Sequence, residues 1–297
     1  MSIKIERVAI LSRHADPHVA DLMTSLVQHL TKAGIVVLAR REMSLDLAVE
    51  RVDEIDLAAN ADMLIAIGGD GTMLYAGNLA RDFGVPLLGV NRGRLGFLAD
   101  VSPDDMLNSV DQILDGNYSC EFRLLLSATL SRAGGDSVTA IAFNDIVLQR
   151  RETGRMLDIV TSIDDSYVNT HSGDGLIVAT PTGSTAYALS CGGPIVDPRL
   201  DAILVVPVCP HTLTDRPVVI PANQTIDVRV LEREDTKAEI MIDGNTIGPI
   251  GPEDVLSISA SDKRIQLIHP PGYDFFGILR SKLFWGRDNR ARDKGAE

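Results

Sequence analysis

Several things are scarce in this chain, and the first two are aromatic residues and cysteines. Aromatic residues make up 4% of the 297 residues while hydrophobic residues reach 45%. The core must therefore be mainly aliphatic, as in sheet proteins packed with Val, Ile, Leu and Ala. The three cysteines, Cys120, Cys191 and Cys209, are odd in number and lack a C-x-x-C spacing. We expect reduced thiols, with neither a disulfide framework nor a zinc site.

Positive charge and long apolar runs are also in short supply. The formal net charge of −13 argues against binding the nucleic-acid backbone. An anionic ligand must therefore be held by local amides, local arginines or a metal ion. No run approaches the roughly 18 apolar residues of a membrane span, and residues 1–6 lack the apolar segment of a secretory signal. We expect a cytoplasmic protein that binds neither nucleic acid nor membranes.

Familiar catalytic and nucleotide motifs are missing as well. The chain has no G-x-x-x-x-G-K-[ST], and no complete G-x-G-x-x-G follows a strand, so neither a P-loop nor a standard dinucleotide fold is supported. It also lacks H-E-x-x-H and G-x-S-x-G, which weakens the case for a zinc peptidase or a serine hydrolase.

What is present begins with a regular alternation of strand-like and helix-like segments. This spacing predicts a Rossmann-like α/β domain with a parallel, doubly wound sheet, whose ligands bind beyond the carboxyl ends of the strands. The predicted strands are 7–11, 35–38, 63–67 and 86–90, and the predicted helices are 16–33, 45–57, 72–81 and 103–114.

After about residue 120 short β-prone runs separated by turns replace this alternation, which predicts a mostly β second domain. We expect the first domain to cover residues 1–120 and the second to cover 121–274, with the amphipathic tail at 275–297 packing back on the first. The predicted strands of the second domain are 123–130, 140–148, 157–163, 176–179, 202–208, 217–220, 226–231, 238–242, 255–259 and 264–268.

The segment 63–74 is the most informative stretch of the first domain. Five apolar residues without alternation are typical of a strand covered on both faces, and they run into Gly68, Gly69, Asp70 and Gly71. Glycines at a helix N-terminus let a ligand approach the backbone, and the amides there favour an anion such as phosphate. A plain turn with Asp70 as helix cap explains the pattern equally well.

Two polar features stand out in the second domain. Residues 173–187 place a carboxylate before a buried strand and a hydroxyl-rich turn after it, which suits either ligand recognition or simple helix capping. The pair Asn144 and Asp145 interrupts an apolar run, and a ligand contact explains it as well as a β-bulge or an exposed edge does. Residues 243–245 form a natural hairpin turn.

Taken together, these motifs resemble one family, the bacterial NAD kinases. They occur in family order and span nearly the whole chain, and their combination is highly specific although each alone is weak. The matching segments are 68–72, 91–98, 144–145, 173–190, 209–217 and 243–244.

The resemblance implies transfer of the γ-phosphoryl group of ATP, or of another phosphoryl donor, to the adenosine ribose 2′-hydroxyl of NAD, which gives NADP. It also implies a divalent metal, usually Mg²⁺, whose protein ligands the sequence does not identify. The fold would be related to the diacylglycerol kinase and phosphofructokinase superfamily. Members are homo-oligomers, dimers or commonly tetramers, in which a neighbouring subunit can help to complete the site.

The resemblance also implies roles for individual residues. Asp70 would be the general base, and the loops around it, together with Arg94, would hold the triphosphate and the metal. Arg155 matches a basic substrate-contact position that can serve the adjacent subunit. The expected binding residues are Gly68, Gly69, Gly71, Thr72, Arg94, Asn144, Asp145, Arg155, Ser172, Asp174, Thr182, Thr185, Ala186, Tyr187, Ser190 and Asn245.

Two positions depart from the common family pattern. Ser172 stands two residues before Asp174, where many members carry a basic residue, which leaves the choice between NAD and NADH open. Asn245 stands where glutamine is common, and its reach is shorter by one methylene. A lipid or sugar kinase of the same superfamily, or an inactive dinucleotide-binding regulator, remains an alternative to NAD kinase.

Overall fold

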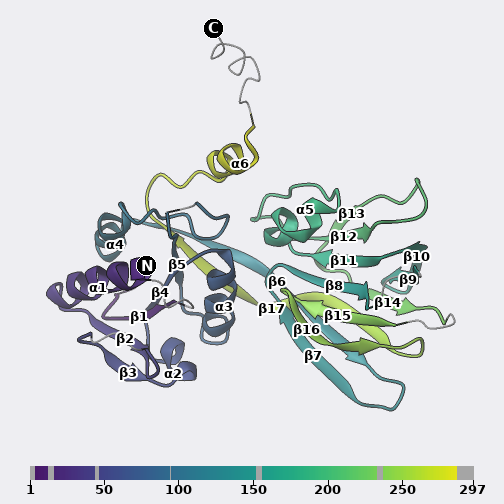
Figure 1. Ribbon diagram of the computed structural model, residues 1–297, viewed down its shortest axis with the longest axis horizontal. Coiled ribbons are helices and arrows are strands. Elements are labelled where there is room, and N and C mark those ends of the chain that lie inside the picture. The colour runs from purple at the N-terminus through teal and green to yellow at the C-terminus, as the bar shows by residue number, and fades with distance from the viewer. Residues whose placement is uncertain are drawn as a thin grey trace, which may run out of the picture. The chain divides into compact units, whose positions relative to one another are not determined.

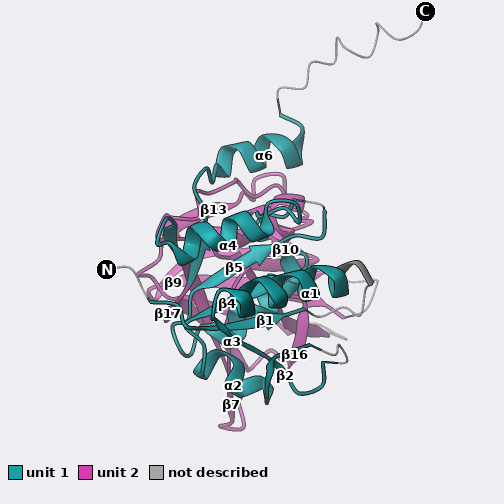
Figure 2. Ribbon diagram, turned by 90° about the vertical axis from the view of Figure 1, so that its left-hand side faces the viewer, with its two compact units in different colours: residues 1–121, 266–297 teal, residues 122–265 magenta. Residues whose placement is uncertain are grey.

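The computed structural model describes residues 4–12, 17–43, 47–93, 95–151, 156–232 and 237–285. The chain divides into two compact units (Figure 2). Unit 1 comprises Met1–Glu121 and Gln266–Glu297, and unit 2 comprises Phe122–Ile265.

Unit 1 contains a parallel sheet in the strand order β5-β4-β1-β2-β3. Every residue of β4 is buried, because helices cover both faces of the sheet. The end of β17 also belongs to unit 1, where Leu267 pairs in parallel with Leu87 of β5. The predicted Rossmann-like sheet is confirmed, and the C-terminal return to it is made by the end of β17, before the predicted tail 275–297. The strands are β1 Arg7–Leu11, β2 Val36–Arg40, β3 Glu50–Val52, β4 Met63–Ile67, β5 Leu87–Val90 and β17 Val255–His269.

Helices of unit 1 lie on both faces of this sheet (Figure 1). Buried residues of α1 and α4, such as Leu26 and Val110, pack against alternate residues of β1 and β4, such as Ile10 and Ile65. On the other face, Met73 of α3 packs against Gly89 of β5. A Cβ added to Gly89 would lie only 2.8 Å from the sulfur of Met73. The helices are α1 Pro17–Lys32, α2 Glu54–Ala59, α3 Asp70–Ala80, α4 Met106–Leu114 and α6 Phe275–Leu283.

The helix predicted over 45–57 is wrong in most of its length. Residues 50–52 form β3, which pairs with β2 through Leu38 and Glu50, and only the short helix α2 follows. The segment is acidic and lacks a full apolar stripe at helical spacing, so pairing at the open edge of β2 decides its structure. Residues 44–46 lie outside the described part of the chain.

Unit 2 is mostly β, as predicted, and its strands pair in antiparallel fashion. One sheet has the order β13-β12-β11-β8-β15-β16, and β10, β9, β14 and the first part of β17 pair in a second group. The strands are β6 Ser119–Ser131, β7 Ser137–Ala142, β8 Asp145–Arg150, β9 Leu157–Ile163, β10 Ser166–Gly173, β11 Gly175–Ala179, β12 Ala202–Val208, β13 Val218–Pro221, β14 Ile226–Val230, β15 Ala238–Ile242 and β16 Asn245–Ile250.

Three details of unit 2 differ from the sequence prediction. The single strand predicted over 140–148 is broken into β7 and β8, whereas the segments 255–259 and 264–268 belong to one long strand, β17. The sequence prediction also missed β10 and β16, because their exposed polar residues give little hydrophobic signal. Each is held by pairing with a neighbouring strand instead.

The six-stranded sheet of unit 2 is buried on both faces. One face, with Leu148, Val178 and Ile203, packs against buried apolar residues of the second group of strands. The opposite face, with Val147 and Ile177, packs against Ala188 of the short helix α5 Tyr187–Ser190. Among the described residues, no helix has the length and apolar character needed to cross a membrane.

Candidate active site

The turn between β4 and α3 contains the candidate general base. Asp70 is the first residue of α3, two residues before the predicted start, and Gly69 precedes it as the N-cap. Gly68 has to be a glycine, because a Cβ there would stand 2.2 Å from the hydroxyl oxygen of the buried Thr72. By contrast, no described atom lies within 4 Å of a Cβ built on Gly69 or Gly71. These two glycines therefore leave room for a ligand beside the backbone.

The carboxylate of Asp70 is held by three backbone amides from the loop 95–101. Phe97 N–H donates to Oδ2 at 3.1 Å, and Leu98 and Ala99 donate to Oδ1 at 2.9 and 3.4 Å. Gly96 allows this close approach, since a Cβ there would lie 2.2 Å from Oδ1. A carboxylate can accept about four hydrogen bonds. With respect to the described residues, one acceptor position, on Oδ2, thus stays available for a substrate hydroxyl.

Sequence reasoning included the segment 91–98 among the family motifs, but it gave the backbone amides of residues 97–99 no role. Residues 97–99 are apolar or small, and their contribution is made through backbone N–H groups that no side-chain pattern reveals. They lie 27 to 29 residues beyond Asp70 in the chain. A signal could have been sought in Gly96, since a glycine next to an apolar run often marks a close backbone approach.

In unit 2 the break between β7 and β8 is organised by Asp243. Its carboxylate accepts the backbone N–H groups of Phe143, Asn144 and Asp145 at 2.8, 2.7 and 3.2 Å. Asp243 itself lies in the hairpin turn between β15 and β16, with φ of +47°. The predicted hairpin turn is confirmed. In addition, the carboxylate of Asp243 binds backbone N–H groups about a hundred residues earlier in the chain. The side-chain amide of Asn144 makes no hydrogen bond to any residue in the described ranges, so it is available to a ligand.

Asp145 is a buried carboxylate with an altered proton affinity. Burial is the main cause that raises its pKa to about 6, and the nearby charge of Asp243 raises it further. A hydrogen bond from the backbone N–H of Tyr187 at the start of α5 opposes both effects. A carboxylate that exchanges its proton near neutral pH is a common feature of functional sites.

The hydroxyl-rich turn after β11 is fastened to the same break. Thr180 donates its hydroxyl to the Phe143 carbonyl at 2.7 Å, and its own N–H donates to the Asn144 carbonyl at 2.9 Å. Gly183 N–H in turn donates to the Thr180 hydroxyl. The carbonyl of Asn144 would lie 2.1 Å from a Cβ on Gly183, so only glycine fits. The structure thereby brings residues 182–187 beside Asn144 and Asp145.

The other predicted residues of unit 2 differ in how far they are already engaged. Asp174 pairs with Arg150 through two contacts of 3.1 and 3.3 Å, and the Ser172 hydroxyl donates to Asp158 across β9 and β10. Thr185 donates to the carbonyl of Thr182 at 3.2 Å. Three residues of the predicted set are exposed on their own unit: Tyr187, Ser190 and Asn245.

The remaining predicted residues are not brought together by a described contact. Arg94 and Arg155 lie outside the described part of the chain. Asp70 and its glycines belong to unit 1, whereas residues 144–190 and Asn245 belong to unit 2. Within the described ranges, no group of three or more His, Cys, Asp or Glu side chains is arranged to hold a metal ion.

Comparison with known families defines the class of protein. A model of the ATP-NAD kinase N-terminal domain matches residues 8–118, and a model of the ATP-NAD kinase C-terminal domain matches residues 143–270. The two matched ranges contain the Asp70 turn and the Asn144 break respectively. The fold and these matches indicate a kinase built from two domains.

Curated relatives then specify which kinase. The chain is 40% identical to the NAD kinase of Aromatoleum aromaticum over 98% of this chain and 97% of that protein. It is 41% identical to the NAD kinase of Teredinibacter turnerae over 94% and 96% of the two chains. The chain therefore belongs to the NAD kinase family, as the sequence motifs suggested, and not to the lipid or sugar kinases.

Solved structures show the same fold. Yeast NADH kinase complexed with NADH aligns with a TM-score of 0.87 at 24% identity, over 96% of this chain and 89% of the yeast chain. An NAD kinase from Archaeoglobus fulgidus in complex with ATP aligns with a TM-score of 0.72 at 25% identity, over 93% and 99%.

Proposed function

We propose that this NAD kinase transfers the γ-phosphoryl group of ATP to the 2′-hydroxyl of the adenosine ribose of NAD, with Asp70 as the proton acceptor. The observation that carries this proposal is the Asp70 carboxylate, which three amides hold at the start of α3 with one acceptor position left. The O2′–P bond forms as the bond between the γ-phosphorus and the bridging oxygen breaks. ADP leaves, and the hydroxyl proton passes to Asp70.

The chemistry is compatible with a weak base. Phosphoryl transfer passes through a loose transition state, so positioning and neutralisation of charge supply most of the acceleration. Asp70 orients the hydroxyl first and takes its proton late in the step. The fixed amides of residues 97–99 support that role because they set the direction of the carboxylate before substrate arrives.

The Asp70 turn is also our proposed site for the ATP phosphates. The N-terminus of α3 carries a partial positive charge from its free backbone N–H groups, which favours an anion. A divalent metal, most simply Mg²⁺, would neutralise the phosphates and be held by them with one or two protein carboxylates. A metal shared with phosphates needs no cluster of protein ligands, so the remaining acceptor position of Asp70 stays assigned to the substrate hydroxyl.

Replacing Gly71 by alanine should impair the binding of ATP without impairing folding. A methyl group here meets no described atom, and alanine is the better helix former, so the free energy of unfolding should stay unchanged or rise by up to roughly 1 kcal/mol. The methyl would occupy the space beside the backbone that the phosphates need, and kcat/KM for ATP should fall about tenfold or more. Thermal unfolding and ATP-dependent initial rates measure the two effects. An unchanged kcat/KM would place the phosphates elsewhere.

We further propose that unit 2 binds the dinucleotide. The free side-chain amide of Asn144 and the ionised Asp145 suit ribose or carboxamide groups, and Tyr187 offers an aromatic face to a base. Thr182, Thr185, Ala186 and Ser190 would line the pocket, with Asp174 and Asn245 toward the nicotinamide side. Arg94 and Arg155 would add positive charge for the phosphates. Ser172 is engaged with Asp158, which leaves the choice between NAD and NADH to experiment.

The raised pKa of Asp145 gives a pH dependence with a definite sign. The folded protein holds this proton up to about pH 6, whereas the unfolded chain releases it near pH 4. The ionised, buried form therefore lowers the free energy of unfolding as pH rises from about 4 to about 6. Asp145→Asn should unfold at a higher temperature than the wild type at pH 7, and this advantage should disappear at pH 4. Thermal unfolding at both values tests it.

The ionised form of Asp145, which lowers the free energy of unfolding, should favour the binding of NAD. If NAD is recognised by the ionised carboxylate, its KM should rise roughly tenfold between pH 7 and pH 5, where about one molecule in ten keeps the charge. In Asp145→Asn the KM should be high at both pH values. A wild-type KM that stays flat across this range would remove Asp145 from the charged contacts to substrate.

We propose that the chain assembles as a homo-oligomer, a dimer or a tetramer, through unit 2. Two edge strands of this unit expose apolar residues: β13 with Val218 and Val219, and β10 with Tyr167 and Val168. Exposed apolar edge strands are natural pairing surfaces. Light scattering of the purified protein measures the assembly, and a monomer would contradict it.

One assay matrix tests the proposed reaction. The purified protein is given ATP or polyphosphate as donor, and NAD, NADH or an NAD analogue without the adenosine 2′-hydroxyl as acceptor, with Mg²⁺ throughout. We expect product from ATP with NAD and none from the analogue. Phosphorylation of the analogue would contradict the 2′-hydroxyl as the acceptor.

A further inference from the structure

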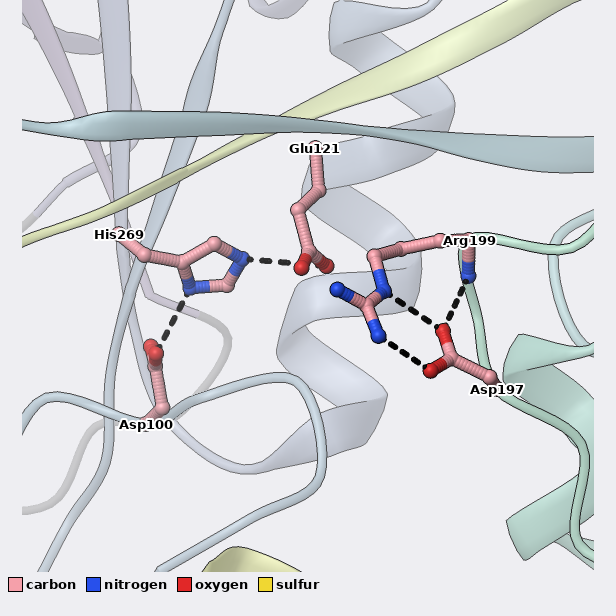
Figure 3. A network of polar contacts seen from close by, with 5 residues as sticks. All are labelled: Asp100, Glu121, Asp197, Arg199 and His269. Carbon is pink, nitrogen blue, oxygen red and sulfur yellow. Dashed lines mark hydrogen bonds and ion pairs between the residues drawn. The ribbon is translucent and has the colours of Figure 1, made fainter. Parts of the chain in front are cut away.

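The loop 95–101, which holds Asp70, is itself fastened by a buried contact between a carboxylate and an imidazole. Oδ2 of Asp100 lies 2.8 Å from Nδ1 of His269, and the side chains are only 8% and 3% exposed (Figure 3). In this hydrogen bond Nδ1–H of His269 donates to the carboxylate of Asp100. Both residues belong to unit 1.

Asp100 occupies a critical place in the loop. The amide of the preceding residue, Ala99, donates to Asp70 at 3.4 Å, while the following residue, Val101, donates its N–H to the carbonyl of Gly89 in β5. The side chain of Asp100 thus anchors the loop between a contact to the candidate base and a contact to the sheet. Any displacement of Asp100 is passed to the amides that orient Asp70.

His269 is well placed to be the fixed end of this connection. It is the last residue of β17, and Leu267, two residues earlier, pairs with β5. Its ring stacks on Tyr273 with centroids 3.7 Å apart, and Nε2 lies 3.7 Å from a carboxylate oxygen of Glu121. The strand, the stacked ring and the second carboxylate hold the imidazole on three sides. Figure 3 shows the two carboxylates, Asp100 and Glu121, on either side of the ring.

We propose that His269 is a positioning residue for phosphoryl transfer. Through Asp100 it holds the loop 95–101 so that the amides of residues 97–99 orient the Asp70 carboxylate. This inference rests on the proposed role of Asp70 as proton acceptor. It assigns a task in the reaction to a residue that acts through another residue.

Two replacements of His269 distinguish positioning from simple filling of the core. In His269→Asn the side-chain N–H₂ reaches the place of Nδ1 and can still donate to Asp100, whereas in His269→Gln it reaches the place of Nε2 instead. We expect the Asn variant to keep kcat within about threefold of the wild type. The Gln variant should lose about 10-fold to 100-fold in kcat, the effect of a misplaced catalytic group, with KM for NAD unchanged.

The same variants in an Asp70→Asn background complete the test. If His269 acts through Asp70, His269→Gln should lower the residual rate of Asp70→Asn by less than about threefold, because the group it positions is gone. Equal kcat for the Asn and Gln variants, or a full additional loss in the Asp70→Asn background, would overturn the inference. If instead Asp70→Asn alone keeps wild-type kcat, the proposed role of Asp70 fails, and that outcome is recognisable by itself.

A second pair of variants covers the case in which His269→Gln does not fold, as judged by thermal unfolding. Asp100→Asn keeps the shape and an acceptor oxygen for His269, whereas Asp100→Leu keeps a similar shape without an acceptor. We expect near wild-type kcat for the Asn variant and a loss of about 10-fold or more for the Leu variant. Equal kcat in both variants would overturn the inference by this route.

Discussion

Replacing Asp70 by asparagine should lower kcat by about 10²-fold to 10⁴-fold, the usual contribution of a positioned general base. The variant should remain folded. Its amide oxygen can still accept from Leu98 and Ala99, and only the bond from Phe97 N–H to Oδ2 is lost. That loss should cost about 1 kcal/mol in free energy of unfolding. NAD binding should change little, because all the proposed dinucleotide contacts except that of Asp70 with the 2′-hydroxyl lie in unit 2.

A matched control separates catalysis from loss of the carboxylate as a backbone acceptor. Asp62 also belongs to unit 1, and its Oδ2 accepts the N–H groups of Glu6 and Arg7, each at 2.8 Å. In Asp62→Asn the amide oxygen can take the place of Oδ2 and keep both bonds without the charge, so this variant should lose about 1 kcal/mol or less and keep its kcat. Steady-state rates, calorimetric binding of NAD and thermal unfolding of both variants give the comparison. If the two variants lose kcat equally, Asp70 acts as a structural residue only.

Replacing Gly183 by alanine should lower kcat/KM for NAD by about 100-fold. The new methyl carbon would stand 2.1 Å from the carbonyl oxygen of Asn144. The methyl is fixed directly to one backbone segment and the oxygen belongs to another, so no flexible side chain can move aside. The turn after β11 must then move away from the β7–β8 break, which disrupts the bonds that Thr180 makes to both segments. Misplacement of binding groups by about 1 Å has effects of this size.

The control for Gly183→Ala is Gly134→Ala, in unit 2 between β6 and β7. No described atom lies within 4 Å of a Cβ at Gly134, and this variant should keep wild-type rates. Gly183→Ala should also lose about 1 to 3 kcal/mol in free energy of unfolding, the usual cost of overpacking. Initial rates at varied NAD, with thermal unfolding of both variants, test the prediction. Wild-type kcat/KM in Gly183→Ala would show that residues 182–187 are not part of the NAD site.

The sequence predicts the strongly patterned parts of this fold. The strand 63–67 matches β4 because an unbroken apolar run bounded by glycines has few alternatives. The prediction of a helix over 45–57 is wrong because residues 50–52 pair with the edge of β2. This pairing is a tertiary feature that the local sequence does not show. The gap between β7 and β8 was visible only as the polar pair 144–145, and two interpretations of it remained open.

For the candidate site, the sequence identifies side chains but not what holds them. The segment 68–72 pointed to Asp70, yet the amides that orient it come from residues that are apolar or small. In the same way, Asp243 could be predicted as a hairpin residue. Its bonds to the amides of residues 143–145 span about a hundred positions and depend on how the strands pair. His269 and Asp100 meet across 169 positions, a distance at which no local pattern operates.

The most direct test of the central claim is the formation of NADP by the purified full-length chain with ATP, NAD and Mg²⁺. We predict that NADP and ADP accumulate in equal amounts, as transfer of one phosphoryl group to one hydroxyl requires. ADP without NADP, or no turnover by a protein shown to be folded, would contradict the account.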